Sequence, residues 1–239
     1  MAKRMIGCVA VAAACAILTG CGGPEDAAPD SLEPDVAGSS SSLLDACAAS
    51  AANFAPRLAL PQSSLSESSW YTASLKDSWG PLAAVLPAAS VPTGCDAARW
   101  KRDRVVAAAK NYIGLPYQHH HIPAWNPRSA WPGEEGPGLD CSNFTSWVYN
   151  FGLGVKFTSN VRSQADGASA PGRRLGASEA LAPGDLLFIL NSSRTAIGHV
   201  VLYVDPYHII DATSGLTVQV RSFSGWYKTR FSHARRVIE

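Results

Sequence analysis

The chain has 239 residues, of which 46% are hydrophobic and 16% charged, and its formal net charge is +1. This length and composition support one main globular domain with an N-terminal appendage. The small net charge gives no reason to expect a nucleic acid partner.

Residues 1–20 have the pattern of a secretory signal. Lys3 and Arg4 precede an apolar run that ends at Leu18, which is too short for a stable membrane span. The sequence Leu18-Thr19-Gly20-Cys21 resembles the lipobox of bacterial lipoproteins, which implies cleavage before Cys21 and a membrane anchor through lipid on its thiol. An ordinary signal with small residues near the cleavage site is the alternative. Both interpretations place the mature protein outside the cytoplasm.

Cleavage would remove two basic residues and no acidic ones, which changes the formal net charge from +1 to −1. By resemblance to lipoproteins, Gly22 after the cysteine favours the outer membrane, with the protein facing the periplasm. Residues 21–43 are rich in Gly, Pro, Ala, Ser and acidic residues, so we expect a flexible tether with a reach of about 25 Å. Residues 44–97 contain Ala-rich stretches, 43–52 and 82–89, between prolines, which predicts a small helical lobe.

We expect the six cysteines to have different roles. Cys8 and Cys15 leave with the signal, and Cys21 carries lipid. In an oxidising compartment Cys47 and Cys95 are the natural disulfide pair, and Cys141 is then the free thiol. A free cysteine is either a nucleophile or a small buried hydrophobe, and the cysteine count alone does not separate the two.

A helix is predicted over residues 97–113, with Asp96 as its N-cap and Gly114 and Pro116 as its stop. The Pro- and Gly-rich stretch that follows, 118–137, predicts a long loop at the rim of a site. It contains His119, His120 and His121. Side chains of adjacent residues splay apart, and no Cys, Asp or Glu accompanies these three at metal-ligand spacing, so we expect neither a metal nor a cofactor.

A second helix is predicted to begin at Asp140-Cys141-Ser142, because Phe144, Trp147, Val148 and Phe151 recur at helical spacing. At a helix start the unsatisfied N–H groups and the helix dipole favour an anion, and therefore the thiolate form of Cys141. A thiolate there is a candidate nucleophile. Asp140 is equally consistent with a helix N-cap.

The C-terminal third predicts an antiparallel sheet, with strands at 186–190, 199–204 and 208–212 and further candidates at 217–220 and 235–238. If residues 205–207 form the turn, Val204 faces His208 and Asp211 pairs with Val201, so that Asp211 lies on the same face as His199. A carboxylate there would orient the imidazole. Taken singly, each residue is as consistent with a structural role; together with Cys141 they predict a Cys-His-Asp triad.

These residues resemble the NlpC family of papain-like cell-wall peptidases. The resemblance covers about residues 98–239 and rests on five segments and one residue: 114–117, 139–142, Gln164, 183–186, 199–203 and 234–237. It implies an α+β papain-like fold in which helices pack on an antiparallel sheet and the nucleophile begins the central helix. The chain departs from the usual family pattern at Asn143, where glycine is common, and at Asp211, where a neutral His, Asn or Gln is common.

The resemblance also implies a cysteine endopeptidase that cuts the peptidoglycan stem peptide, without a cofactor. It places Tyr117, Asp140, Ser142 and Gln164 at the substrate, with Asp140 as acceptor for a free amine. Two rivals stay open: an amidase or acyltransferase of the same fold acting on a lipid or another amide, and a peptidoglycan-binding module without activity.

Overall fold

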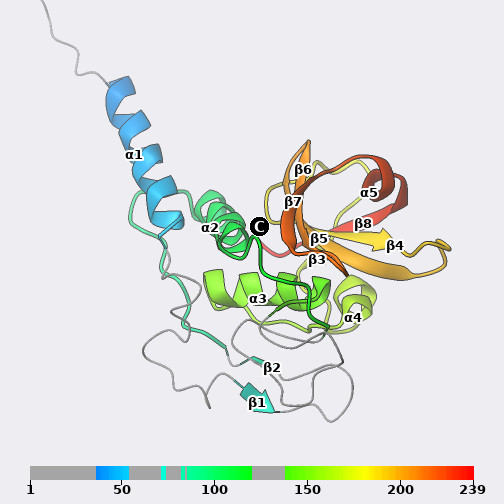
Figure 1. Ribbon diagram of the computed structural model, residues 1–239. Coiled ribbons are helices and arrows are strands. Elements are labelled where there is room, and N and C mark those ends of the chain that lie inside the picture. Colours follow the sequence, from blue (N-terminus) through cyan, green and yellow to red (C-terminus); the bar gives the residue numbers. More distant parts are fainter. Residues whose placement is uncertain (1–35, 54–70, 74–81, 84, 120–137) are drawn as a thin grey trace, which may run out of the picture. The chain divides into compact units, whose positions relative to one another are not determined.

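The computed structural model describes residues 36–53, 71–73, 82–83, 85–119 and 138–239 (Figure 1). The helices are α1 (Val36–Ala51), α2 (Ala97–Asn111), α3 (Cys141–Leu153), α4 (Val161–Asp166) and α5 (Gly225–Arg230). The strands are β1 (Tyr71–Ala73), β2 (Leu82–Ala83), β3 (Arg173–Arg174), β4 (Leu186–Leu190), β5 (Ile197–Asp205), β6 (His208–Ala212), β7 (Val218–Ser222) and β8 (Phe231–Arg236).

The main sheet has six strands in the order β3-β8-β4-β5-β6-β7, and every neighbouring pair is antiparallel. Both of its faces are buried. Even-numbered residues such as Leu186, Val200 and Ile210 belong to the core that includes α2 and α3. Odd-numbered residues such as Leu187 and Val201 belong to a second core on the other face. The alternation follows from the two-residue period of side chains in a strand.

Helix α3 is the central helix, in contact with α2 and with strands β5 and β6 (Figure 1). Twelve of its 13 residues are buried, including the four that predicted its apolar stripe. It ends at Gly154, whose φ of 69° is left-handed and favours glycine. A Cβ at Gly154 would lie 2.6 Å from the carbonyl oxygen of Leu86, so glycine also permits close approach of the segment that precedes α2.

Helix α2 matches the sequence prediction closely. The side chain of its N-cap, Asp96, accepts a hydrogen bond from the N–H of Arg99 at 2.7 Å. The helix ends three residues before Gly114, which has a φ of 85°. The predicted N-cap and stop are therefore confirmed, and the end of the helix is two residues earlier than expected.

The N-terminal segment differs from the predicted lobe. Helix α1 begins at Val36, inside the range expected to be a tether, and residues 85–90 form no helix where one was predicted over 82–89. The Ala-rich stretch 85–90 instead lies along α3, where the N–H of Leu86 donates to Asn150 Oδ1 at 2.9 Å. Ala51 and Leu86 are buried in the core of α2 and α3, so the described part of this segment shares that core.

Two links hold α1 and its neighbours together. Cys47 of α1 and Cys95, just before the N-cap of α2, lie with their Cα atoms 5.8 Å apart and form a disulfide. Arg104 of α2 donates to the carbonyl oxygens of Gly152 in α3 and Asn53 after α1, at 2.7 and 3.2 Å. These contacts join three segments that are far apart in the sequence.

The register of β5 and β6 is the one that the sequence predicts, since Leu202 faces Ile210 and Tyr203 faces Ile209. The difference lies at the turn, where an irregularity places Asp205, and not Val204, opposite His208. The side chain of Asp205 binds the N–H groups of Tyr207 and His208, at 2.8 and 2.9 Å, and thereby closes a tighter turn than the one expected.

Candidate active site

The first turn of α3 presents Cys141, which the structure describes as a buried free cysteine. Its predecessor, Asp140, caps the helix: Asp140 Oδ1 accepts from the N–H groups of Ser142 and Asn143 at 2.9 and 2.8 Å. A thiol at the capped start of a helix is placed where the N–H groups and dipole favour a thiolate.

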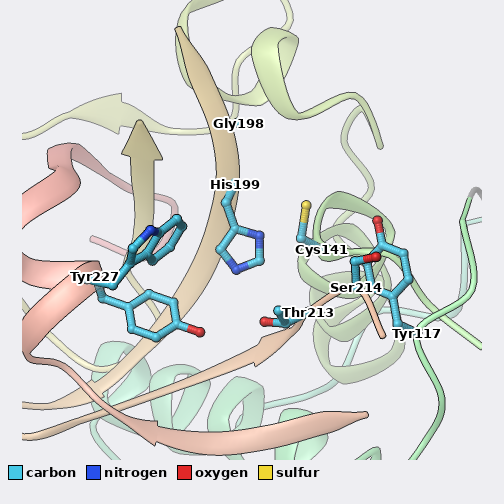
Figure 2. A pocket seen from close by; sticks show the side chains of 8 residues that line it. Tyr117, Cys141, Gly198, His199, Thr213, Ser214 and Tyr227 are labelled. Atoms are coloured by element: carbon cyan, nitrogen blue, oxygen red, sulfur yellow. The ribbon is translucent and has the colours of Figure 1, made fainter. Parts of the chain in front are cut away.

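His199 faces Cys141 from β5 (Figure 2). Its Nε2 lies 2.8 Å from Asp211 Oδ2, so Nδ1 is the ring nitrogen left for the sulfur. Burial of the ring opposes its charged form, but the negative charges of Cys141 and Asp211 and hydrogen bonds to both raise the pKa of His199 to about 10. The arrangement favours an imidazolium beside a thiolate.

Asp211 is fully buried and accepts hydrogen bonds from four side chains. Its Oδ2 accepts from His199 Nε2, from Thr213 Oγ1 at 2.7 Å and from the Tyr227 hydroxyl at 2.7 Å. Its Oδ1 accepts from Arg221 Nε at 2.6 Å. Burial alone would raise the pKa of Asp211, but its hydrogen bonds and the charge of His199 lower it, so this carboxyl is held as an anion.

A cavity of about 410 Å³ opens over the sulfur and the imidazole. Figure 2 shows the labelled side chains that surround it, with Tyr117 on the Cys141 side and Tyr227 on the His199 side. The full lining consists of Tyr117, Cys141, Gly198, His199, Thr213, Ser214, Trp226 and Tyr227. Besides the reacting pair, the wall has three aromatic side chains, and the hydroxyl groups of its tyrosines, Thr213 and Ser214 are the polar groups available to fix a ligand.

Tyr117 reaches this cavity because residues 114–117 run beside the start of β7. The N–H of Gly114 donates to Val218 O, and the N–H of Tyr117 donates to Leu216 O, both at 2.9 Å. Pro116 forms a bridge with Thr217. The structure thus places Tyr117 in the lining of the cavity, and its contact with substrate stays a prediction.

The other three residues expected at the substrate lie beneath the cavity. Asp140, Ser142 and Gln164 are 4%, 3% and 0% exposed, and none of them lines the cavity. The Gln164 side-chain amide donates to Ser142 O at 2.9 Å and to Thr158 O at 2.7 Å, and its oxygen accepts from Thr145 Oγ1 at 3.0 Å. In this structure the three residues therefore support the turn that carries Cys141, and their contact with substrate stays a prediction.

Asn143 adds to the enclosure of Asp140. Its side-chain amide donates to Asp140 Oδ2 at 3.1 Å, while Asp140 Oδ1 binds the helix N–H groups and the Ser142 hydroxyl. Both oxygens of the carboxylate are thus engaged by the first turn of α3. The N-cap interpretation of Asp140 is confirmed, and the acceptor for a free amine is covered in this structure.

Sequence reasoning missed Thr213, Arg221, Trp226 and Tyr227. Trp226 and Tyr227 belong to α5, a helix of six residues that is too short to show a period in the sequence. The signal that was available is the adjacent aromatic pair within a polar stretch, just after the predicted strand 217–220.

Two expectations concern residues outside those that the structure describes. His120, His121 and most of the predicted rim loop 118–137 are among them, as are the predicted signal and Cys21. Within the described ranges, no group of three or more His, Cys, Asp or Glu side chains is arranged to hold a metal ion. In the same ranges, no helix is long and apolar enough to span a membrane.

The comparisons with known proteins match the segment that carries this site. Residues 128–236 match the NlpC/P60 family. This segment, which carries Cys141, His199 and Asp211, is similar to that family. The α+β fold expected from the sequence, with helices packed on an antiparallel sheet and Cys141 at the start of the central helix, is confirmed by the structure.

Two curated relatives match part of the chain. The chain is 27% identical over 133 residues to a gamma-DL-glutamyl hydrolase of Bacillus subtilis, a match that covers 55% of this chain and 28% of the relative. It is 33% identical over 122 residues to a probable endopeptidase p60 of Listeria grayi, covering 50% of this chain and 20% of the relative. The aligned part therefore spans between a fifth and just over a quarter of these relatives' length.

Solved structures of similar fold include a hypothetical invasion protein of Mycobacterium tuberculosis, with 23% identity and a TM-score of 0.49 over 64% of this chain and 71% of the other. An NlpC/P60 family protein from Bacillus cereus has 22% identity and a TM-score of 0.45, covering 64% of this chain and 42% of the other.

Proposed function

We propose that the protein is a cysteine peptidase of the cell envelope that hydrolyses peptide bonds in peptidoglycan stem peptides. The observation that carries the proposal is the facing pair of Cys141 and His199, with Asp211 on the far nitrogen of the ring, at the wall of an open cavity. The match of residues 128–236 to the NlpC/P60 family supports a hydrolase, and the names of the two curated relatives support a peptide-type bond.

The chemistry is acyl transfer in two steps. The Cys141 thiolate attacks the carbonyl carbon of the scissile bond, and the His199 imidazolium donates its proton to the leaving amine. Water then attacks the thioester while neutral His199 accepts a proton from that water. The carboxylate product is released, and the thiolate of Cys141 and the imidazolium of His199 are regenerated. Asp211 keeps Nε2 protonated throughout, so Nδ1 exchanges the proton.

The start of α3 also offers a donor to the oxyanion. In the described bonds of this turn, the N–H groups of Ser142 and Asn143 donate to the side chain of Asp140, and that of Phe144 donates to its carbonyl oxygen. The N–H of Cys141 is thereby left as the backbone donor nearest the reacting sulfur. The hydroxyl of Tyr117, which lines the same cavity, is a second candidate donor.

The presence of a complete nucleophile, base and orienting carboxylate supports an enzyme over a module that only binds peptidoglycan. We propose that the protein is located at a membrane of the envelope, to which lipid on Cys21 anchors the chain. The 14 residues between Cys21 and Val36, where the described fold begins, are compatible with reach to the wall layer.

The test is mass spectrometry of sacculus digests made with the mature protein and with its Cys141→Ala variant. We expect new fragments from cleavage within the stem peptide with the first protein and none with the second. Cleavage at an amide outside the stem peptide would favour the amidase alternative, and intact sacculi with measurable binding would favour the binding module.

A further inference from the structure

Arg221 approaches Asp211 diagonally across two strands. In the β6 and β7 register Arg221 lies opposite Ile209, and Asp211 lies opposite Gln219, so Arg221 and Asp211 are diagonal neighbours on one face. Arg221 Nε donates to Asp211 Oδ1 at 2.6 Å, and the arginine side chain is only 19% exposed. This ion pair is largely shielded from water.

The two oxygens of Asp211 have separate partners. Oδ2 accepts from His199, Thr213 and Tyr227, whereas Oδ1 accepts from Arg221. A carboxylate held at one oxygen by a charged donor has little freedom to rotate about its terminal torsion. The bond to Arg221 therefore fixes the oxygen that faces His199.

We propose that Arg221 is a positioning residue for the hydrolysis proposed above: it holds Asp211 in place, and its own positive charge sets the charge balance of the reacting pair. The reacting groups and Arg221 form a row of alternating charge that sums to zero: Arg221, Asp211, His199 and the thiolate of Cys141. The inference rests on the proposed function only in so far as the thiolate and imidazolium are the reacting forms.

The other groups that directly face Asp211 and His199 are uncharged. The charged neighbour of Cys141 is the carboxylate of Asp140, which caps α3 and is the same in every variant tested below. Asp211 is faced by the hydroxyls of Thr213 from the end of β6 and Tyr227 from α5. His199 is faced by Cys141 of α3, by the rings of Trp226 and Tyr227, and across β4 by Ile189. Burial and the charge of Asp211 raise the pKa of Tyr227 to about 12, so its hydroxyl stays neutral. Among the described residues, Arg221 is thus the permanent cation in contact with Asp211.

The ion pair of Arg221 and Asp211 lacks the geometry that makes an arginine–carboxylate pair strongly stabilising. Nη2 of Arg221 is buried and has no acceptor among the described residues, so the guanidinium does not form the two-bond fork typical of strong arginine pairs. Replacing a buried ion pair by apolar side chains is often neutral for folding. What Arg221 supplies here is a fixed positive charge next to Asp211.

The test measures how the rate of Cys141 alkylation by iodoacetamide depends on pH. Removing a positive charge makes proton loss from the Cys141 thiol harder. Arg221→Met should therefore move the midpoint of the alkylation rate–pH profile to higher pH by about one unit. Removing the negative charge with Asp211→Asn should move it to lower pH. Arg221→Lys, which keeps the charge, should stay close to wild type. Arg99→Gln is the control, because its side chain is 64% exposed on α2.

A double variant keeps the test decisive if Arg221→Met alone does not fold. Arg221→Met in the Asp211→Asn background leaves no unpaired buried charge, and its midpoint should lie above that of Asp211→Asn alone. An unchanged or lower midpoint on loss of Arg221, in either background, would overturn the proposal. Folding of each variant is checked by thermal unfolding.

Alkylation needs no substrate, so the two proposals fail separately. Midpoints that shift as expected in a protein that leaves sacculi intact would refute the proposed function and keep the role of Arg221. Midpoints that do not shift, in a protein that digests sacculi, would refute the role of Arg221 alone.

Discussion

The Nε2 atom of His199 lies 2.8 Å from Oδ2 of Asp211, across the antiparallel pair of β5 and β6. The relationship follows from strand parity, because residues 199 and 211 occupy the same face of neighbouring strands. It also gives the buried carboxylate a definite role in orienting the imidazole.

Replacement of Asp211 should therefore impair catalysis. Asp211→Ala should lower kcat by about 10²-fold or more, because the ring loses the acceptor that fixes its orientation and tautomer. Asp211→Asn should retain more activity, since an amide oxygen still accepts the ring N–H. In both variants the pKa of His199 should fall, so the basic limb of the rate–pH profile should move to lower pH.

His208→Ala is the control for this prediction. His208 is half exposed, and its Nδ1 lies 2.9 Å from Asp205 at the turn, away from the cavity. A large loss of activity for His208→Ala beside a small one for Asp211→Ala would contradict the register.

Cys141→Ala and His199→Ala should each abolish hydrolysis of stem peptides without unfolding the protein. The nucleophile and the base act as one unit, so loss of either removes nearly the whole rate enhancement. Turnover is followed by chromatography of muropeptides, and folding by circular dichroism. Residual turnover near wild type in Cys141→Ala would show that another group is the nucleophile.

The strongest sequence signals predicted the elements that carry Cys141, His199 and Asp211. The apolar stripe of α3 has a helical period, and the strands 186–190 and 208–212 have the expected bounds. Such patterns are readable because each reports a regular burial geometry. Parity within a hairpin then predicts which side chains share a face.

The roles of Arg221, Tyr227 and Gln164 were not predictable in the same way. Arg221 lies beyond the predicted end of its strand, and Tyr227 lies in a helix too short to show a period. Gln164 is polar yet fully buried, because three hydrogen bonds satisfy its amide. Only the tertiary structure shows that these partners exist.

Labelling with a fatty-acid analogue tests the proposed anchor. We expect the mature chain to carry label and to fractionate with membranes, whereas Cys21→Ser should be unlabelled. Cys47→Ser, which removes a different cysteine, should still be labelled. An unlabelled wild-type chain that has lost its first 20 residues would rule out lipid at Cys21 and favour an ordinary signal peptide.

Gln164 tests whether residues beneath the cavity support the site or bind substrate. Gln164→Leu removes one hydrogen-bond partner from Thr145 Oγ1 and from each of the carbonyl oxygens of Ser142 and Thr158, although Thr145 Oγ1 can still donate to Ser142 O. We expect the free energy of unfolding to fall by about 1–3 kcal/mol, because buried polar groups lose their hydrogen bonds. At temperatures where the variant is folded, KM should change little. A large rise in KM with unchanged stability would restore the interpretation of Gln164 as a substrate ligand.

The thiol content of the protein tests the cysteine allocation. In the non-reduced mature chain lacking Cys21, a thiol reagent under denaturing conditions should find one free thiol, at Cys141, because Cys47 and Cys95 are bonded. Three free thiols in the non-reduced protein would show that the pair is open, and a modified Cys47 with a protected Cys141 would reverse the allocation.

The disulfide closes a loop with a sequence separation of 48, which in the chain-entropy model contributes about 4 kcal/mol to stability. Reduction should therefore lower the midpoint of thermal unfolding, and Cys47→Ala with Cys95→Ala should reproduce that decrease without reductant. Because the bond lies at α1 and the start of α2, away from the cavity lining, the double variant should keep its turnover number at temperatures where it is folded.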